Sequence, residues 1–151
     1  MVDIVSAEVR SRMMSGIKGK DTKPELIIRK DLHAAGFRYL LHDKRLPGKP
    51  DMVFPKWQAV IFVHGCFWHG HDCHLFRLPA TRTTFWRDKI AGNVERDRKA
   101  IESLDKSGWR TGLVWECALK GKARLPIADV IVDIANWLEG NSNRFTIRGA
   151  T

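Results

Sequence analysis

The apolar run Val60 to Val63 leads directly into a segment crowded with metal-binding side chains. Four consecutive apolar residues predict a strand that is buried on both faces, in the middle of a sheet. The ten residues that follow, His64 to Cys73, contain three histidines, two cysteines and an adjacent aromatic pair. A purely structural domain has little reason to gather so many metal-binding and proton-transferring groups at the end of a buried strand. The segment therefore predicts a metal-dependent enzyme.

The charge of the chain points to an anionic partner. Its 151 residues include 26 lysines and arginines against 17 aspartates and glutamates, a formal net charge of +9. This excess favours nucleic acid or an anionic membrane. The membrane is the weaker interpretation, because no apolar stretch approaches the roughly 20 residues of a spanning helix and the N-terminus has no hydrophobic signal core. A basic charge that serves solubility alone is the remaining alternative.

The length favours one domain with a core that needs no disulfides. Residues 1–20 are polar and basic and are predicted to form an arm that contacts DNA, with residues 21–151 as the single domain. The three cysteines are an odd number, so a disulfide framework would leave one thiol over. With no secretion signal we expect a cytoplasmic protein, where cysteines near histidines hold zinc more often than they form bridges.

The pattern of apolar residues predicts an α/β fold. Thr22 and Glu25 are placed to close a capping box at the start of a helix that ends near Gly36. Strands are predicted at residues 37–41, 51–54, 57–63 and 109–115, and further helices at 84–104 and 128–138. Because predicted strands are interspersed with predicted helices in this order, we expect a mixed central sheet flanked by helices.

Asp51 follows Pro50 at the start of the second predicted strand. A leading aspartate of this kind resembles the core of PD-(D/E)xK nucleases, in which an acid-x-Lys on the next strand completes a divalent metal site. Here Phe62 stands in place of the second acid and His64 in place of the lysine. An aspartate that only caps a turn is the alternative.

Three thiols and one imidazole form a second candidate site. Cys66, His71, Cys73 and the distant Cys117 make a Cys₃His set, which suits tetrahedral structural zinc. His69 and His74 are possible substitutes for His71. Zinc would attach the loop to Cys117, whereas the alternative is a set of buried thiols beside a surface histidine loop.

Phe67 and Trp68 form a third candidate site inside the same loop. Aromatic side chains wedged between bases unstack and kink DNA, and Met13 or Met14 could form a second wedge. The alternatives are an aromatic mini-core on the zinc loop and methionines that pack in the core. Several basic side chains could contact phosphates, namely Lys18, Lys20, Arg77, Arg82, Arg87 and Lys89.

Six blocks in order resemble one family, the very-short-patch repair (Vsr) DNA mismatch endonucleases, between about Arg10 and Gly121. The blocks are residues 48–51, 60–73, 78–83, 85–86, 93–97 and 114–119. The resemblance implies an enzyme that nicks DNA 5′ to the thymine of a T:G mismatch. It also implies a PD-(D/E)xK-like endonuclease fold, a link to a cytosine methyltransferase and to a MutL-type repair protein, and action at the bacterial nucleoid. One small nicking domain needs no partner chain, so we expect a monomer.

The resemblance assigns roles to individual residues. Asp51 bridges two Mg²⁺ ions, and the carbonyl of Val63, where the family usually has threonine, is a further ligand. His69 is the base, and Asp97 supports it. Glu25 positions water in the metal shell, and His64 acts near the scissile phosphate. One structural zinc is held by Cys66, His71, Cys73 and Cys117. The intercalating residues are Phe67, Trp68 and Met14, and the mismatch is read by Lys89 and Asn93.

Two other functions fit parts of the sequence. A non-catalytic, zinc-stabilised DNA-binding module would use only the basic and aromatic side chains, and it would gain nothing from Asp51 beside a phosphate. A nuclease of the HNH kind would also use a histidine base, but it requires ββα geometry around residues 64–73.

Overall fold

The apolar run that was predicted as a central strand lies in the middle of a five-stranded sheet. In the computed structural model the strand order is β1 to β5, with β3 (Ala59–His64) flanked by β2 and β4. The pairs β1–β2 and β2–β3 are antiparallel, whereas β3–β4 and β4–β5 are parallel. The prediction of a mixed α/β sheet is therefore confirmed. The other strands are β1 (Leu40–Leu41), β2 (Met52–Phe54), β4 (Arg110–Trp115) and β5 (Arg144–Ile147).

The structure describes residues 23–150. The predicted arm at residues 1–20, the wedge methionine Met14 and the predicted helix cap Thr22 lie outside the described residues. Within that range, no helix is long and apolar enough to cross a bilayer.

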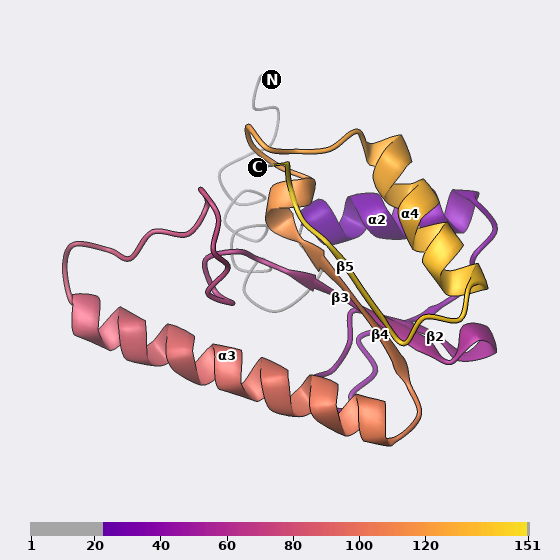
Figure 1. Cartoon of the computed structure of the whole chain (residues 1–151), viewed down its shortest axis with the longest axis horizontal. Coiled ribbons are helices and arrows are strands. Elements are labelled where there is room, and N and C mark those ends of the chain that lie inside the picture. Colours follow the sequence, from indigo (N-terminus) through magenta and orange to yellow (C-terminus); the bar gives the residue numbers. More distant parts are fainter. Residues whose placement is uncertain (1–22, 151) are drawn as a thin grey trace, which may run out of the picture.

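Helices cover both faces of the sheet (Figure 1). Helices α2 (Lys23–Ala34) and α4 (Ile127–Glu139) lie on one face, and α3 (Thr83–Lys106) lies along the other. Side chains of β3 point alternately toward α2 and α4 and toward α3, because successive residues of a strand point to opposite faces of the sheet. Ile61 packs in the core under α2 and α4, whereas Val60 and Phe62 pack with Leu104 of α3. This double burial explains why β3 is apolar at nearly every position.

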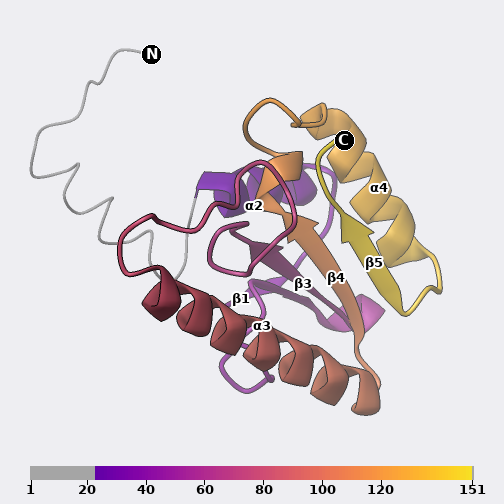
Figure 2. The same cartoon turned by 60° about the vertical axis from the view of Figure 1, so that its left-hand side comes forward.

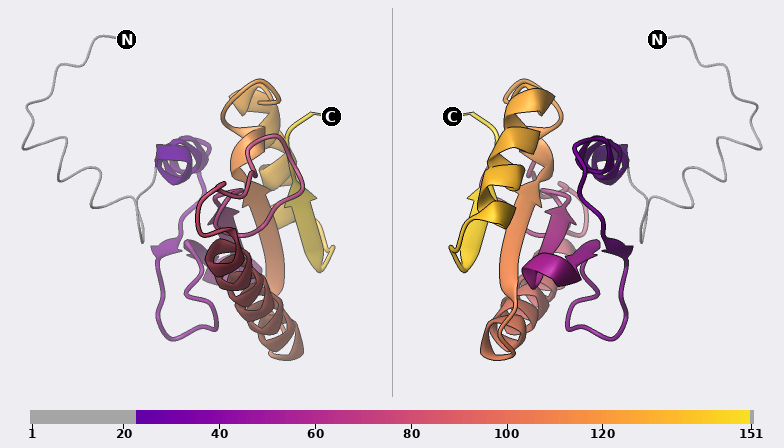
Figure 3. Two further views of the ribbon diagram at one scale, coloured as in Figure 1. Left: turned by 90° about the vertical axis from the view of Figure 1, so that its left-hand side faces the viewer. Right: turned by 90° about the vertical axis from the view of Figure 1, so that its right-hand side faces the viewer.

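The loop of residues 65–82 returns over the carboxyl ends of β3 and β4. Figure 2 and the left panel of Figure 3 show it beside the short helix η2 (Glu116–Ala118), which follows β4. Because β3 and β4 are parallel, their carboxyl ends meet at this edge of the sheet, and the loop closes over both. The segment that is richest in histidine and cysteine is thus held between two strand ends.

Two strand assignments differ from the sequence-based expectation. The strand expected at residues 37–41 is confined to Leu40–Leu41, because Phe37 turns into the core instead of continuing the ladder. Strand β5 was not predicted. It is an edge strand in which only Ile147 is buried, so its sequence lacks the apolar alternation that marks a strand.

Candidate active site and metal centre

Asp51 lies where β2 begins and β3 ends. Since these strands are antiparallel, the start of β2 is adjacent to the carboxyl end of β3. The Asp51 Oδ2 atom accepts a hydrogen bond from the backbone N–H of Val63, at 2.7 Å. The predicted acid and the predicted carbonyl residue therefore lie side by side, although Val63 is 12 positions further along the chain.

Two further side chains converge on Asp51. Glu25 of α2 is 2% exposed, and its Oε2 atom lies 2.6 Å from His42 Nε2. The same His42 nitrogen is 3.9 Å from Asp51 Oδ1. Burial raises the pKa of Asp51 to about 7, and the nearby Glu25 carboxylate adds to the rise. The ligand atoms of Glu25, His42 and Asp51 lie within 4.8 Å of one another and could hold a metal ion.

His42 was not predicted as a site residue, whereas Glu25 was expected both to cap a helix and to position water at the metal site. The structure places the Glu25 carboxylate against His42 and Arg29, whatever role it has at the helix start. His42 stands alone in a polar loop, 17 residues from Glu25. No local pattern could have marked it.

A histidine pair lies on the α3 side of the same strand end. The His64 ring stacks on the His69 ring with centroids 3.8 Å apart and planes 2° from parallel. His69 Nδ1 is 2.5 Å from Asp97 Oδ2 of α3. This carboxylate orients the His69 ring and leaves Nε2 as its remaining nitrogen.

His64 is held in its neutral form. Burial lowers the pKa of His64 to about 3, and the neighbouring His69 contributes to the decrease. Its Nδ1 atom has no hydrogen-bond partner among residues 23–150. Because His64 directly follows Val63 and stacks on His69, the Asp51 carboxylate and the His69 imidazole lie at the same end of the sheet.

The four predicted zinc ligands form one cluster, in which Cys73 is partly exposed and the other three are buried. The Sγ atoms of Cys66 and Cys117 lie 3.5 and 3.6 Å from His71 Nδ1, and the ligand atoms of all four residues are within 4.8 Å of one another. Burial raises the pKa of the Cys66 thiol, so its thiolate requires a nearby cation. Soft thiolates with one imidazole are a donor set that fits a tetrahedral metal. His71 rather than His69 or His74 completes the set.

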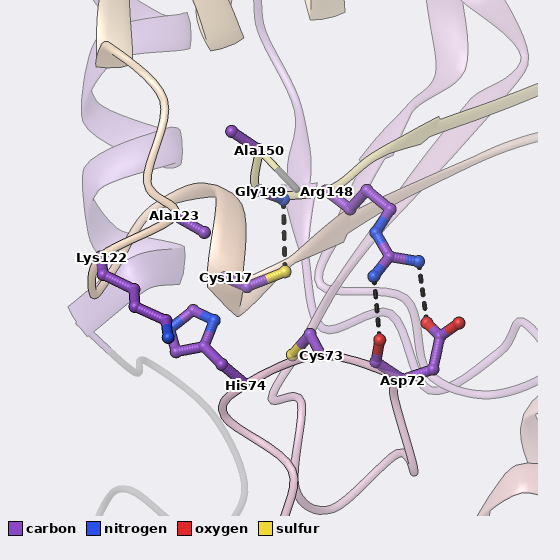
Figure 4. Close-up of a pocket in the computed structure, with 9 residues that line it drawn as sticks. All are labelled: Asp72, Cys73, His74, Cys117, Lys122, Ala123, Arg148, Gly149 and Ala150. Atoms are coloured by element: carbon purple, nitrogen blue, oxygen red, sulfur yellow. Dashed lines mark hydrogen bonds and ion pairs between the residues drawn. The ribbon is translucent and has the colours of Figure 1, made fainter.

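The C-terminal segment lies beside Cys73 and Cys117 of this cluster (Figure 4). The Gly149 N–H donates to Cys117 Sγ at 3.2 Å, and Arg148 pairs with Asp72 at 2.7 Å. A cavity of about 400 Å³ lies beside them, lined in part by His74 and Lys122. The C-terminal segment therefore contacts both the loop, through Asp72, and Cys117.

The predicted wedge residues belong to a larger aromatic group on the loop and α3. Phe67 contacts Trp68, Phe76 and Trp86, with ring centroids 5.2, 6.1 and 5.7 Å away. Trp68 is nevertheless 46% exposed. The mini-core alternative therefore describes Phe67 better than Trp68. The sequence analysis assigned no role to Trp86, whose ring also lies 5.8 Å from Trp68.

The two residues predicted to read the mismatch both lie on α3. Lys89 is exposed, whereas the Asn93 side chain donates to the Trp68 carbonyl at 2.9 Å and accepts from Arg96. Asn93 therefore supports the loop that carries the exposed tryptophan. Residues 65–73 form turns and bends, which is not the ββα arrangement that an HNH nuclease requires.

Comparison with known proteins identifies the family. The sequence model described as DNA mismatch endonuclease Vsr matches residues 2–75. The chain is 42% identical over 151 residues to the DNA mismatch endonuclease Vsr of Escherichia coli (strain K12), covering 99% of this chain and 97% of that protein. The chain belongs to the Vsr family. The resemblance identified from the six sequence blocks is therefore confirmed.

Two further relatives are type II nicking enzymes. The type II nicking enzyme V.NmeAIP of Neisseria meningitidis is 49% identical over 123 residues, which cover 82% of this chain and 88% of that protein. The type II nicking enzyme V.XorIIP of Xanthomonas oryzae is 46% identical over 119 residues, with 79% and 88% covered.

Proposed function

We propose that this chain is a strand-specific DNA endonuclease that nicks 5′ to the thymine of T:G mismatches in very short patch repair. Family membership supports the reaction class. The observation that carries the proposal is the convergence of Asp51 and the Asp97-oriented His69 at one strand end. A carboxylate beside the phosphates would repel DNA in a module that only binds, so its place here favours catalysis.

The Asp51 carboxylate and the Val63 carbonyl are the residues that would hold Mg²⁺, with two ions per site. Bound there, two divalent ions would stabilise both the attacking and the leaving oxygen of an in-line phosphodiester displacement. Carboxylate and carbonyl oxygens are ligands that suit Mg²⁺. The rise in the pKa of Asp51 indicates that its charged form lacks compensation without a cation.

His69 would remove the proton from the attacking water. Asp97 holds Nδ1, so that Nε2 can accept a proton and the imidazolium that forms is stabilised. His64 stays neutral beside it and would hydrogen-bond to the scissile phosphate, while Glu25 would position water on the other side of Asp51. The proposed base and the proposed metal carboxylate thereby lie at the same end of the sheet.

We also propose that the fold is a variant of the PD-(D/E)xK nuclease fold. Asp51 immediately precedes β2 of the β2–β3 hairpin, as the leading aspartate of that fold does. Phe62, which stands at the position of the second acid, has no carboxylate to bind a metal. Its ring packs in the core under α3 and is only 5% exposed. The Val63 carbonyl would fill that role instead, since a backbone ligand does not depend on side-chain chemistry.

The remaining assignments concern zinc and DNA. The Cys₃His cluster would hold one structural Zn²⁺. Trp68, together with Phe67 and Met14 of the arm at residues 1–20, would wedge between bases beside the mismatch, with Lys89 and Asn93 near it. A T:G wobble pair stacks less well than a matched pair, so opening it costs less and the wedge adds discrimination.

The partner we propose is double-stranded DNA that carries a T:G mismatch, bound by a monomer at the bacterial nucleoid in the cytoplasm. A functional link to a cytosine methyltransferase and contact with a MutL-type protein follow from the family resemblance.

Cleavage of otherwise identical duplexes that carry T:G, T:A or C:G at one position tests the proposal. We expect a single nick 5′ to the thymine in the T:G duplex only, with added Mg²⁺. The Asp51→Ala variant should lose nicking and keep mismatch binding. If Asp51→Ala nicks T:G duplexes at the wild-type rate, the mechanism is wrong; if the wild-type protein binds but never nicks, the chain is a binding module.

A further inference from the structure

His42 occupies an unusual and well-fixed position in the loop after β1. Its backbone φ is +47°, a left-handed value that residues other than glycine adopt infrequently, though histidine adopts it more often than most. The His42 N–H donates to the Asp51 carbonyl at 3.2 Å, and its side chain is only 11% exposed. Strained backbone of this kind persists where the surroundings over-determine it, and it gathers at ligand and catalytic sites.

The imidazole of His42 points between two carboxylates. Its Nε2 atom is 2.6 Å from Glu25 Oε2 and 3.9 Å from Asp51 Oδ1. Arg29 also pairs with Glu25 Oε2, at 3.2 Å, so that this carboxylate is oriented from two sides. Three elements that are distant in sequence, α2, the loop after β1 and the start of β2, thus bring one nitrogen and two oxygen ligands together.

We propose that Glu25, His42 and Asp51 form a nitrogen-containing metal site that prefers a transition-metal ion such as Mn²⁺ to Mg²⁺. An imidazole nitrogen is a ligand of transition-metal ions, whereas Mg²⁺ is held by oxygen ligands. The three ligand atoms are within 4.8 Å of one another, a spacing that a single ion can draw together. This inference rests on the proposed function, because Asp51 is also the proposed Mg²⁺ carboxylate; in this site Glu25 would bind the ion directly instead of positioning water.

The competing explanation is that His42 serves only as a hydrogen-bonding partner of Glu25. In that case the imidazole never binds metal, and its replacement changes the affinities for Mn²⁺ and Mg²⁺ by the same factor. His42→Gln separates the two explanations. Glutamine keeps a side-chain N–H that can donate to Glu25, but it removes the imidazole lone pair.

The test uses the full-length, zinc-loaded protein without DNA. Mn²⁺ is titrated in while the free ion is followed by its EPR signal, and Mg²⁺ affinity is obtained by competition. We expect His42→Gln to weaken Mn²⁺ binding about tenfold and Mg²⁺ binding less than about threefold. His33→Gln, which replaces an exposed imidazole on α2, is the matched control and should change neither affinity.

Pulsed EPR of the Mn²⁺-loaded protein gives a second readout that does not need the variant to fold. With ¹⁵N-labelled histidine, the wild-type protein should show nitrogen coupling to Mn²⁺. No coupling in the wild type, or an unchanged Mn²⁺-to-Mg²⁺ affinity ratio in a folded His42→Gln protein, overturns the inference. Mg²⁺-dependent nicking of a T:G duplex is measured in parallel: nicking without nitrogen coupling refutes this site alone, and coupling without nicking refutes the proposed function alone.

Discussion

His69 of the loop and Asp97 of α3 are 28 residues apart in sequence, yet Nδ1 of the histidine lies 2.5 Å from Oδ2 of the aspartate. The carboxylate orients the ring, and the stacked His64 covers one of its faces. A histidine base held in this way has Nδ1 engaged by the carboxylate and Nε2 available to accept a proton.

Asp97→Asn should therefore reduce the nicking rate about 100-fold, because the amide cannot stabilise the imidazolium that forms during proton transfer. Binding of the T:G duplex should change little, since Asp97 would act only through His69. Single-turnover nicking and equilibrium binding measure the two effects. Asp105→Asn, on the same helix but far along it, is the control. A nicking rate within twofold of wild type would contradict the role of Asp97.

Asp51 should make the metal-free protein less stable as the pH rises. A carboxyl group whose pKa is raised by folding stabilises the folded state fully below its unfolded pKa, near 3.8, and this contribution is lost as the pH rises through about 7. Asp51→Asn removes the titration. The melting temperature of Asp51→Asn, relative to that of the wild-type protein, should therefore rise between pH 5 and pH 8.

Thermal unfolding in chelator-treated buffer that leaves zinc in place measures this difference. Saturating Mg²⁺ should stabilise the wild-type protein at pH 8 and not Asp51→Asn, because the cation binds only the folded site. An identical pH dependence for both proteins would show that Asp51 is ionised normally.

Cys117→Ser should release the metal from the Cys₃His cluster. This thiol contacts His71 and receives the Gly149 N–H, so its loss frees both the loop and the C-terminal segment. We expect less than one zinc per chain and a melting temperature lower by about 10 °C, equivalent to roughly 3 kcal/mol for a domain of this size. Elemental analysis and calorimetry provide the measurements. His74→Ala, beside the cluster, should keep its zinc; equal zinc content in both variants would argue against the site.

Trp68→Ala should weaken the preference for T:G over T:A duplexes while leaving the stability of the fold nearly unchanged. Nearly half of this side chain is exposed, so the fold loses little, whereas an intercalating ring contributes about 1–3 kcal/mol of stacking. The ratio of T:A to T:G dissociation constants should fall about tenfold or more. Val132→Ala, an exposed apolar residue on α4, should leave the ratio unchanged. If Trp68→Ala weakens binding to both duplexes equally, the ring contributes to affinity and not to recognition of the mismatch.

Much of the fold could be predicted because its signals are local. The run from Val60 to Val63 is apolar on both faces, which is possible only for a strand covered on each side, and β3 has that environment. The helix of residues 84–104 follows from a 3.6-residue period, and α3 extends it by one residue at the start and two at the end. Strand β5 could not be predicted, because an edge strand with one buried residue has neither pattern.

The sequence by itself determined the chemical inventory: the family, the thiols and imidazoles of the loop, and an aspartate at the start of a strand. Only the tertiary structure decided which of these groups meet. Antiparallel pairing brings Asp51 to Val63, and helix packing brings Glu25 to His42 and Asp97 to His69. Such meetings depend on how distant elements pack, and no local pattern of residues encodes the distance between two side chains on different elements.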